Sequence, residues 1–175
     1  VDDDITATAQ TVTASEDVDK TITLAATDVE GRTLSYQITT LPASGTLYQT
    51  SDGTTRGDAI TSVPTTVPDG SHRVIYVSAA NGSGDGHGNF GFKVFSGSAS
   101  SSEATVTVNV TAVSDVPVAT AQTVTVNEDT DVAITLAGID VDGDNLSYKI
   151  STLPSGGTLY QATNDTTRGD TVSEV

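Results

Sequence analysis

The chain contains one strand pattern twice, first as Thr33-Leu34-Ser35-Tyr36-Gln37-Ile38-Thr39 and again as Asn145-Leu146-Ser147-Tyr148-Lys149-Ile150-Ser151. In both copies Leu, Tyr and Ile alternate with polar residues, which is typical of a strand that buries one face. Each copy continues through a proline and a glycine to the sequence Thr-Leu-Tyr-Gln, at residues 46–49 and 158–161. The pattern therefore predicts a β structure that is duplicated along the chain.

The duplication extends well beyond these strands. Residues 8–63 align with residues 120–175 without a gap, at a shift of 112 residues, and about three positions in five are identical. Self-similarity at a fixed spacing indicates tandem repeats. It predicts a linker end at 1–8, a complete repeat at 9–112, an inter-repeat linker at 113–120 and an incomplete second repeat at 121–175. Because the second copy runs only as far as Val175, we expect it to lack the strands that close the first.

Alternation of Thr, Val and aromatic residues predicts the remaining strands of the first copy. They are expected at residues 10–13, 20–25, 59–63, 72–77, 90–95 and 103–110. No segment shows a convincing helical period. A series of short strands with turn residues between them is typical of an antiparallel β-sandwich. The chain has no Cys and no Trp, so the Cys–Trp–Cys pattern of an antibody-type domain is absent.

Composition excludes several classes of function. The chain has 7 Lys and Arg against 23 Asp and Glu, a formal net charge of −16. Nucleic-acid binding needs a clustered basic surface, so no nucleic-acid partner is expected. The absence of Cys excludes disulfides, thiolate metal ligands and a cysteine nucleophile. No apolar run is long enough to span a membrane.

Nothing in the sequence indicates an enzyme. A serine nucleophile would need a positioned base and an orienting acid, and His72 and His87 are the only histidines. Glycoside hydrolysis would need two carboxyl groups facing each other across a cleft, whereas the acidic residues here are grouped in turns. We therefore expect a non-enzymatic protein.

The direction of the strands predicts where the acidic turns meet. Since successive strands alternate in direction, the first turn, one later loop, the linker and a long turn of the second copy all fall at the junction. Their acidic residues are Glu16, Asp17, Asp85, Asp115, Asp140, Asp142 and Asp144. Ca²⁺ takes about six to eight oxygen ligands, mostly carboxylates and carbonyls of flexible loops. A solvated acidic surface is the simpler interpretation, but recurrence at the repeat spacing favours Ca²⁺.

Several motifs resemble the bacterial cadherin-like, Ig-like tandem repeats of large surface adhesins, including those of the repeats-in-toxin type. They include Asn127-Glu128-Asp129-Thr130, Asp140-Val141-Asp142-Gly143-Asp144 and Gly88-Asn89-Phe90-Gly91-Phe92. The resemblance covers nearly the whole chain. It implies an all-β, Ig-like or cadherin-like sandwich in a rod-like array, with Ca²⁺ between domains, outside the cell or on the bacterial surface.

The resemblance also implies roles for individual acidic residues. Its acidic strand-turn position falls on Glu16 and Glu128, its Asp-x-Asp turn on Asp140 with Asp142 and on Asp28 with Glu30, and its linker acid on Asp115. Three positions depart from the pattern. Ser114 replaces an asparagine, Ser96 replaces an aspartate, and Arg32 replaces the third acid of the first turn. Because Arg32 adds a positive charge where a cation would bind, the junction is the stronger expectation.

Two functions follow as expectations. The first is a structural, calcium-stiffened extracellular repeat of a large bacterial surface adhesin or fibre. Its partners would be neighbouring repeats or identical chains, with any cell-surface or matrix ligand bound through other domains. The alternative is a subunit of a self-assembling filament, in which a neighbouring chain completes the half repeat by adding strands.

The tripeptide Arg-Gly-Asp, which integrins bind, occurs at residues 56–58 and again at 168–170. Glycine followed by aspartate is common at this place in the resembling repeats. We therefore interpret both tripeptides as structural turns rather than as recognition motifs.

Overall fold

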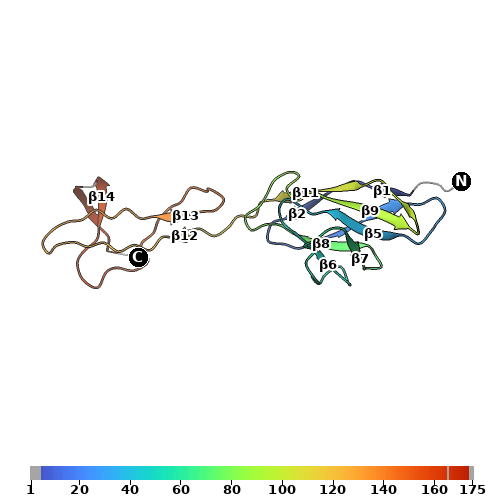
Figure 1. Ribbon diagram of the computed structural model, residues 1–175. Helices are drawn as coiled ribbons and strands as arrows, with labels where there is room; N and C mark the ends of the chain where they lie inside the picture. The colour runs from blue at the N-terminus through green and yellow to red at the C-terminus, as the bar shows by residue number, and fades with distance from the viewer. Residues whose placement is uncertain (1–4, 165, 174–175) are drawn as a thin grey trace. The chain divides into compact units, whose positions relative to one another are not determined.

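The computed structural model describes residues 5–164 and 166–173, and the chain divides into a first unit, Val1–Val113, and a second unit, Ser114–Val175 (Figure 1). The described residues form strands and turns, with no helix among them and thus none that could cross a membrane. Residues 1–4 of the expected linker end and residues 174–175 of the second copy lie outside the described residues.

The first unit is a β-sandwich of two main sheets. One sheet has the order β2 (Gln10–Ser15), β11 (Ala104–Thr111), β9 (Phe90–Ser96), β5 (Ser35–Thr40) and β7 (Thr65–Val67), with β10 (Ala99–Ser100) paired to β9. The other has the order β3 (Lys20–Thr23), β8 (Arg73–Val77) and β6 (Thr46–Gln49). Figure 1 shows β5 beside β9 and β6 beside β8. All pairings are antiparallel except that of β2 with β11, which is parallel. The predicted all-β, Ig-like sandwich is confirmed.

The core of the first unit is built from the apolar face of each strand. Side chains of both sheets are at most 1% exposed and form one cluster, which includes Ile22, Ile38, Leu47, Val74, Tyr76, Phe90, Phe92, Val94, Val106 and Val108. In β11 buried residues alternate strictly with more exposed ones, as expected for a strand with one face inward. Each such side chain contributes about 1.5–3 kcal/mol relative to leaving it in water.

Two expected strands differ from the observed ones. The segment 20–25 divides at Leu24, whose N–H donates to the carbonyl of His72. After it, β4 (Ala25–Thr27) leaves the sheet and pairs with β1 (Thr6–Thr8), a strand inside the expected linker end at 1–8. The strand expected at 59–63 is wrong, because only Ala59 makes an isolated bridge, to Tyr48, before the chain turns into β7.

The second unit has two short antiparallel pairs, β12 (Val118–Ala119) with β13 (Gly138–Ile139) and β14 (Tyr160–Asn164) with β15 (Thr167–Thr171). The pair β12–β13 has the register of β1–β4 at positions 112 higher. The strand expected at 145–151 is not formed. Its counterpart β5 lies between β7 and β9, and the described part of the second unit has no equivalent of either. No described residue of this unit is buried.

Candidate functional site

The long acidic turn of the second unit closes on the carboxylate of Asp140. This residue directly follows β13, and its Oδ1 accepts the backbone N–H groups of Asp142 at 3.0 Å and Asp144 at 3.2 Å. Gly143 sits between them with φ 76°, a left-handed conformation that glycine adopts without steric cost. Three carboxylates are thereby held on one five-residue turn, residues 140–144.

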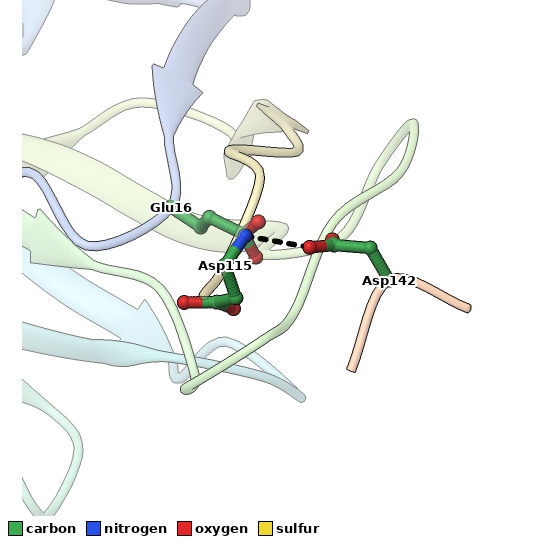
Figure 2. A group of neighbouring side chains, drawn as sticks. All are labelled: Glu16, Asp115 and Asp142. Atoms are coloured by element: carbon green, nitrogen blue, oxygen red, sulfur yellow. Dashed lines mark hydrogen bonds between the residues drawn. The ribbon is translucent and has the colours of Figure 1, made fainter. Parts of the chain in front are cut away.

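The linker residue Asp115 joins this turn within the second unit. In the β12–β13 pair Val118 lies opposite Ile139, and continuing that register brings Asp115 opposite Asp142. The N–H of Asp115 donates to Asp142 Oδ2 at 2.7 Å, the dashed line of Figure 2. A hollow of about 470 Å³ beside this contact is lined by both polar and apolar residues, among them Asp115, Asp140, Asp144, Leu146 and Tyr148. The expected ligands of the second copy's turn and of the linker are therefore brought together.

In the first unit, Glu16 fixes the end of the last strand. It follows β2, is 2% exposed, and accepts the N–H of Val113 on Oε1 at 2.6 Å. Its own N–H donates to the carbonyl of Thr111 at 3.1 Å. Asp17, the next residue, is exposed and has φ 58°. A buried glutamate thus holds Val113, the first residue of the expected linker.

Asp85 lies at the same end of the first unit as Glu16. The neighbouring Gly84 forms a bridge with Val110, and Val110 lies opposite Ala14 near the end of β2. Asp85 itself is exposed, on the loop between β8 and β9. The direction of the strands thus predicted the end of the sandwich at which this loop lies.

The turn at Asp28 carries its own cation. Arg32 donates its N–H to Asp28 Oδ2 at 2.6 Å and its Nη2 to Asp28 Oδ1 at 2.7 Å, while Nη1 lies 3.1 Å from Glu30 Oε2. These hydrogen bonds hold the pKa of Asp28 below its usual value. Position 32 is equivalent to Asp144 of the second copy. Asp28 and Glu30 are therefore brought together with an arginine, at the opposite end of the sandwich from Glu16.

Glu128 is equivalent to Glu16 but has different surroundings. It is exposed, in a turn where Thr130 Oγ1 donates to the carbonyl of Asn127 at 2.7 Å. Glu16 is buried because the end of β11 lies against it. In the described part of the second unit no strand equivalent to β11 is present, so Glu128 has no such cover.

An arginine clamp, not expected from the sequence, occurs in both copies. Arg56 Nε donates to Asp19 at 2.8 Å, and its guanidinium lies over the Tyr48 ring, 5.3 Å from the centroid. Arg168 repeats the arrangement, with 2.6 Å to Asp131 and 4.8 Å to the ring of Tyr160. In each clamp the hydrogen bond from arginine lowers the pKa of the aspartate.

The clamps give both Arg-Gly-Asp sequences a structural role. Gly57 lies against the backbone of β6, where a Cβ would come 3.1 Å from the carbonyl oxygen of Gln49. Its N–H donates to that same carbonyl at 2.7 Å. The sequence signal that could have predicted the clamp is the recurrence of an aspartate, a tyrosine and an arginine at the repeat spacing.

Two further polar contacts of the first unit were not anticipated. Asp69 is 8% exposed and accepts the N–H and the guanidinium of Arg73, which lowers its pKa to about 2. Ser44 Oγ lies 2.6 Å from His87 Nε2, and the Ser44 carbonyl accepts the hydroxyl of Tyr76 at 3.1 Å. The Ser44–His87 contact attaches the loop between β8 and β9 to the turn before β6.

Comparison with known protein families found a similarity to a bacterial Ig domain in the second unit. A family model of that description matches residues 114–173, about a third of the chain. No significant match was found among curated proteins or among solved structures. The match coincides with the unit that contains Asp115 and the Asp140 turn, and it supports a bacterial Ig-like domain.

Proposed function

We propose that the chain is a structural repeat of a large extracellular bacterial adhesin or cell-surface fibre, stiffened by Ca²⁺ bound at the linker between copies. The observation that carries this proposal is the hydrogen bond from Asp115 to Asp142, which gathers the linker acid and the Asp140 turn. The match to a bacterial Ig domain supports the structural role and the location at the cell surface.

The donor chemistry suits a hard cation. Asp115 from the linker and Asp140, Asp142 and Asp144 from the turn after β13 offer carboxylate oxygens, which are ligands that Ca²⁺ prefers. From the first unit, Glu16 and Asp17 are the further ligands we propose, because Glu16 is bonded to Val113, two residues before Asp115. A cation that binds acids on both sides of so short a linker would restrict rotation about it.

Calorimetry and thermal unfolding of the whole chain test this proposal. Extracellular modules bind Ca²⁺ with Kd values of about 0.1–1 mM, so we expect near-saturation at about 10 mM or above. A ligand present at about 100 times Kd and bound only by the folded state raises its stability by about 2.7 kcal/mol. The melting temperature should therefore rise with Ca²⁺. Small-angle scattering should show a narrower distribution of the chain's radius of gyration when Ca²⁺ is present.

Matched variants make the test specific. The double variant Asp140→Asn with Asp142→Asn should abolish the response to Ca²⁺, whereas Asp58→Asn, an exposed aspartate of the first unit, should retain it. Identical melting and scattering of the unaltered chain in Ca²⁺ and in chelator would remove calcium from the proposal.

A second function is favoured by a different observation. Side chains of the second unit are exposed although their equivalents in the first unit are in the core. The pairs are Ile134 (45% exposed) with Ile22 (1%), Leu136 (41%) with Leu24 (2%), and Tyr148 (47%) with Tyr36 (4%). If chains covered these residues for one another, the protein would be a filament subunit. Electron microscopy of the purified chain would show fibres in that case and separate particles otherwise.

A further inference from the structure

The apolar side chains of the second unit form a defined surface. We call it the open face: it comprises the exposed residues that align with the core of the first unit, namely Val124, Val126, Ile134, Leu136, Tyr148 and Leu153, all about 40–50% exposed. Their counterparts are buried in the core cluster or packed against it. Exposed apolar side chains in such number mark a surface that binds something.

The first unit shows which elements cover the equivalent residues. In one sheet β8 lies between β3 and β6, and in the other β11 and β9 lie between β2 and β5. The central strands of both sheets therefore come from the second half of the repeat, residues 64–113. Ile22 lies opposite Val74 of β8, and Ile38 lies opposite Phe92 of β9.

This topology explains which strand pairs the second unit forms. Within the first half of the first repeat, the one regular ladder between named strands is β1–β4, because β2, β3, β5 and β6 all pair with strands of the second half. The second unit keeps the counterpart of that ladder, β12–β13, and adds the local hairpin β14–β15. Its described residues 122–127, 132–135 and 147–152 form no strand, although their counterparts do.

We propose that the open face is a docking surface for a closing half repeat, a polypeptide segment built like residues 64–113 of this chain. A strand like β8 would insert between residues 132–135 and 158–161, and strands like β9 and β11 between residues 147–152 and 122–127. Backbone hydrogen bonds would give affinity, and side chains equivalent to Val74, Phe92 and Val94 would fill the face. The proposal deepens the structural function above by naming the partner of the second unit, and it does not depend on Ca²⁺.

A second copy of the chain is a poorer occupant. Residues 1–175 hold two first halves, which begin near residues 8 and 120, and one closing half at residues 64–113. If copies exchanged their closing halves, one first half in every chain would still be uncovered. Strand exchange between chains of these residues would therefore cover one first half only by uncovering another.

A fusion tests the proposal in the folded chain. Since Val63 aligns with Val175, a copy of residues 64–113 is appended directly after Val175, and hydrogen exchange is measured in chelator. Amides of residues 132–135 and 147–152 should become protected by about a thousandfold or more, as in a stable domain core. A fusion carrying the change equivalent to Phe92→Asp in the appended copy should not gain this protection. In trans, a separately made 64–113 polypeptide should bind the unaltered chain and protect the same amides.

Two outcomes would overturn the proposal. One is an appended segment that exchanges freely while residues 132–135 remain unprotected. The other is protection of these residues in the unaltered chain that increases with protein concentration, together with a dimer in sedimentation, since a second copy would then cover the face. Working in chelator keeps both outcomes separate from a failure of the calcium proposal.

Discussion

Arg32 binds both carboxylate oxygens of Asp28 in the first unit, at the place where the second unit has Asp144. The two aligned turns therefore differ in whether the chain itself supplies a positive charge beside their carboxylates. In the first, a guanidinium neutralises Asp28 and Glu30. In the second, Asp140 and its neighbours carry three negative charges with no basic residue among residues 140–144. We therefore expect an external cation to stabilise only the second turn.

Replacing this arginine should therefore make the first turn dependent on Ca²⁺. In Arg32→Asp the turn would have three carboxylates, as at residues 140–144, and the loss of Arg32 would return the pKa of Asp28 toward its usual value. We expect a lower melting temperature in chelator and recovery in millimolar Ca²⁺, followed by circular dichroism. Arg32→Ala removes the cation without adding a ligand, so it should lose stability without recovering. Equal behaviour of the two variants would contradict this prediction.

Asp142→Asn should weaken Ca²⁺ binding while leaving the turn intact. The asparagine Oδ1 can still accept the N–H of Asp115, whereas one negative charge of the donor set is lost. Ligand charge is a main determinant of Ca²⁺ affinity, so we expect a loss of about tenfold or more by calorimetry. Asp58→Asn removes the same charge from an exposed position and should leave affinity unchanged. An equal loss in both variants would indicate general electrostatics rather than a site.

The sequence predicted buried core positions correctly where a segment with alternating apolar and polar side chains also forms a hydrogen-bonded strand. Tyr36 and Ile38 alternate with polar residues, and β5 forms there with both side chains buried. At Leu24 the alternation continues although the strand ends, because its N–H bonds to His72 and the chain then pairs with β1. Side-chain periodicity reports which face is buried, but it carries no information on which strand receives the backbone hydrogen bonds.

The part of the candidate site that depends only on the direction of the strands could be predicted from the sequence. Asp115 and the Asp140 turn meet because they flank an antiparallel pair, which the strand order implies. The burial of Glu16 was not predictable, since it depends on the backbone of Val113, distant in sequence. Glu128 has the same local sequence and stays exposed, so local sequence alone does not determine the environment of either residue.

Truncating equivalent isoleucines should have unequal effects on the two units. Ile22→Ala removes a buried side chain from between the sheets of the first unit and should cost about 2–5 kcal/mol in the free energy of unfolding. Ile134→Ala removes a side chain that is 45% exposed and should change stability by no more than about 0.5 kcal/mol. Urea unfolding followed by circular dichroism measures both. A large effect of Ile134→Ala in the unaltered chain would mean that the open face is already covered.

Asp69 should make the first unit sensitive to acid. Hydrogen bonds from Arg73 lower its pKa from an ordinary value of 3.8 to about 2 in the folded chain. Because the folded-state pKa is the lower one, its contribution to stability is present above pH 4 and is lost as the pH falls toward 2. The difference in melting temperature between the unaltered chain and Asp69→Asn should be largest near pH 6. It should become smaller as the pH falls from 4 to 2. Asp58→Asn, which removes one negative charge from an exposed position, is the control. Parallel melting curves of Asp69→Asn and the unaltered chain from pH 6 to pH 2 would show that the Arg73 contact adds no acid-labile stability.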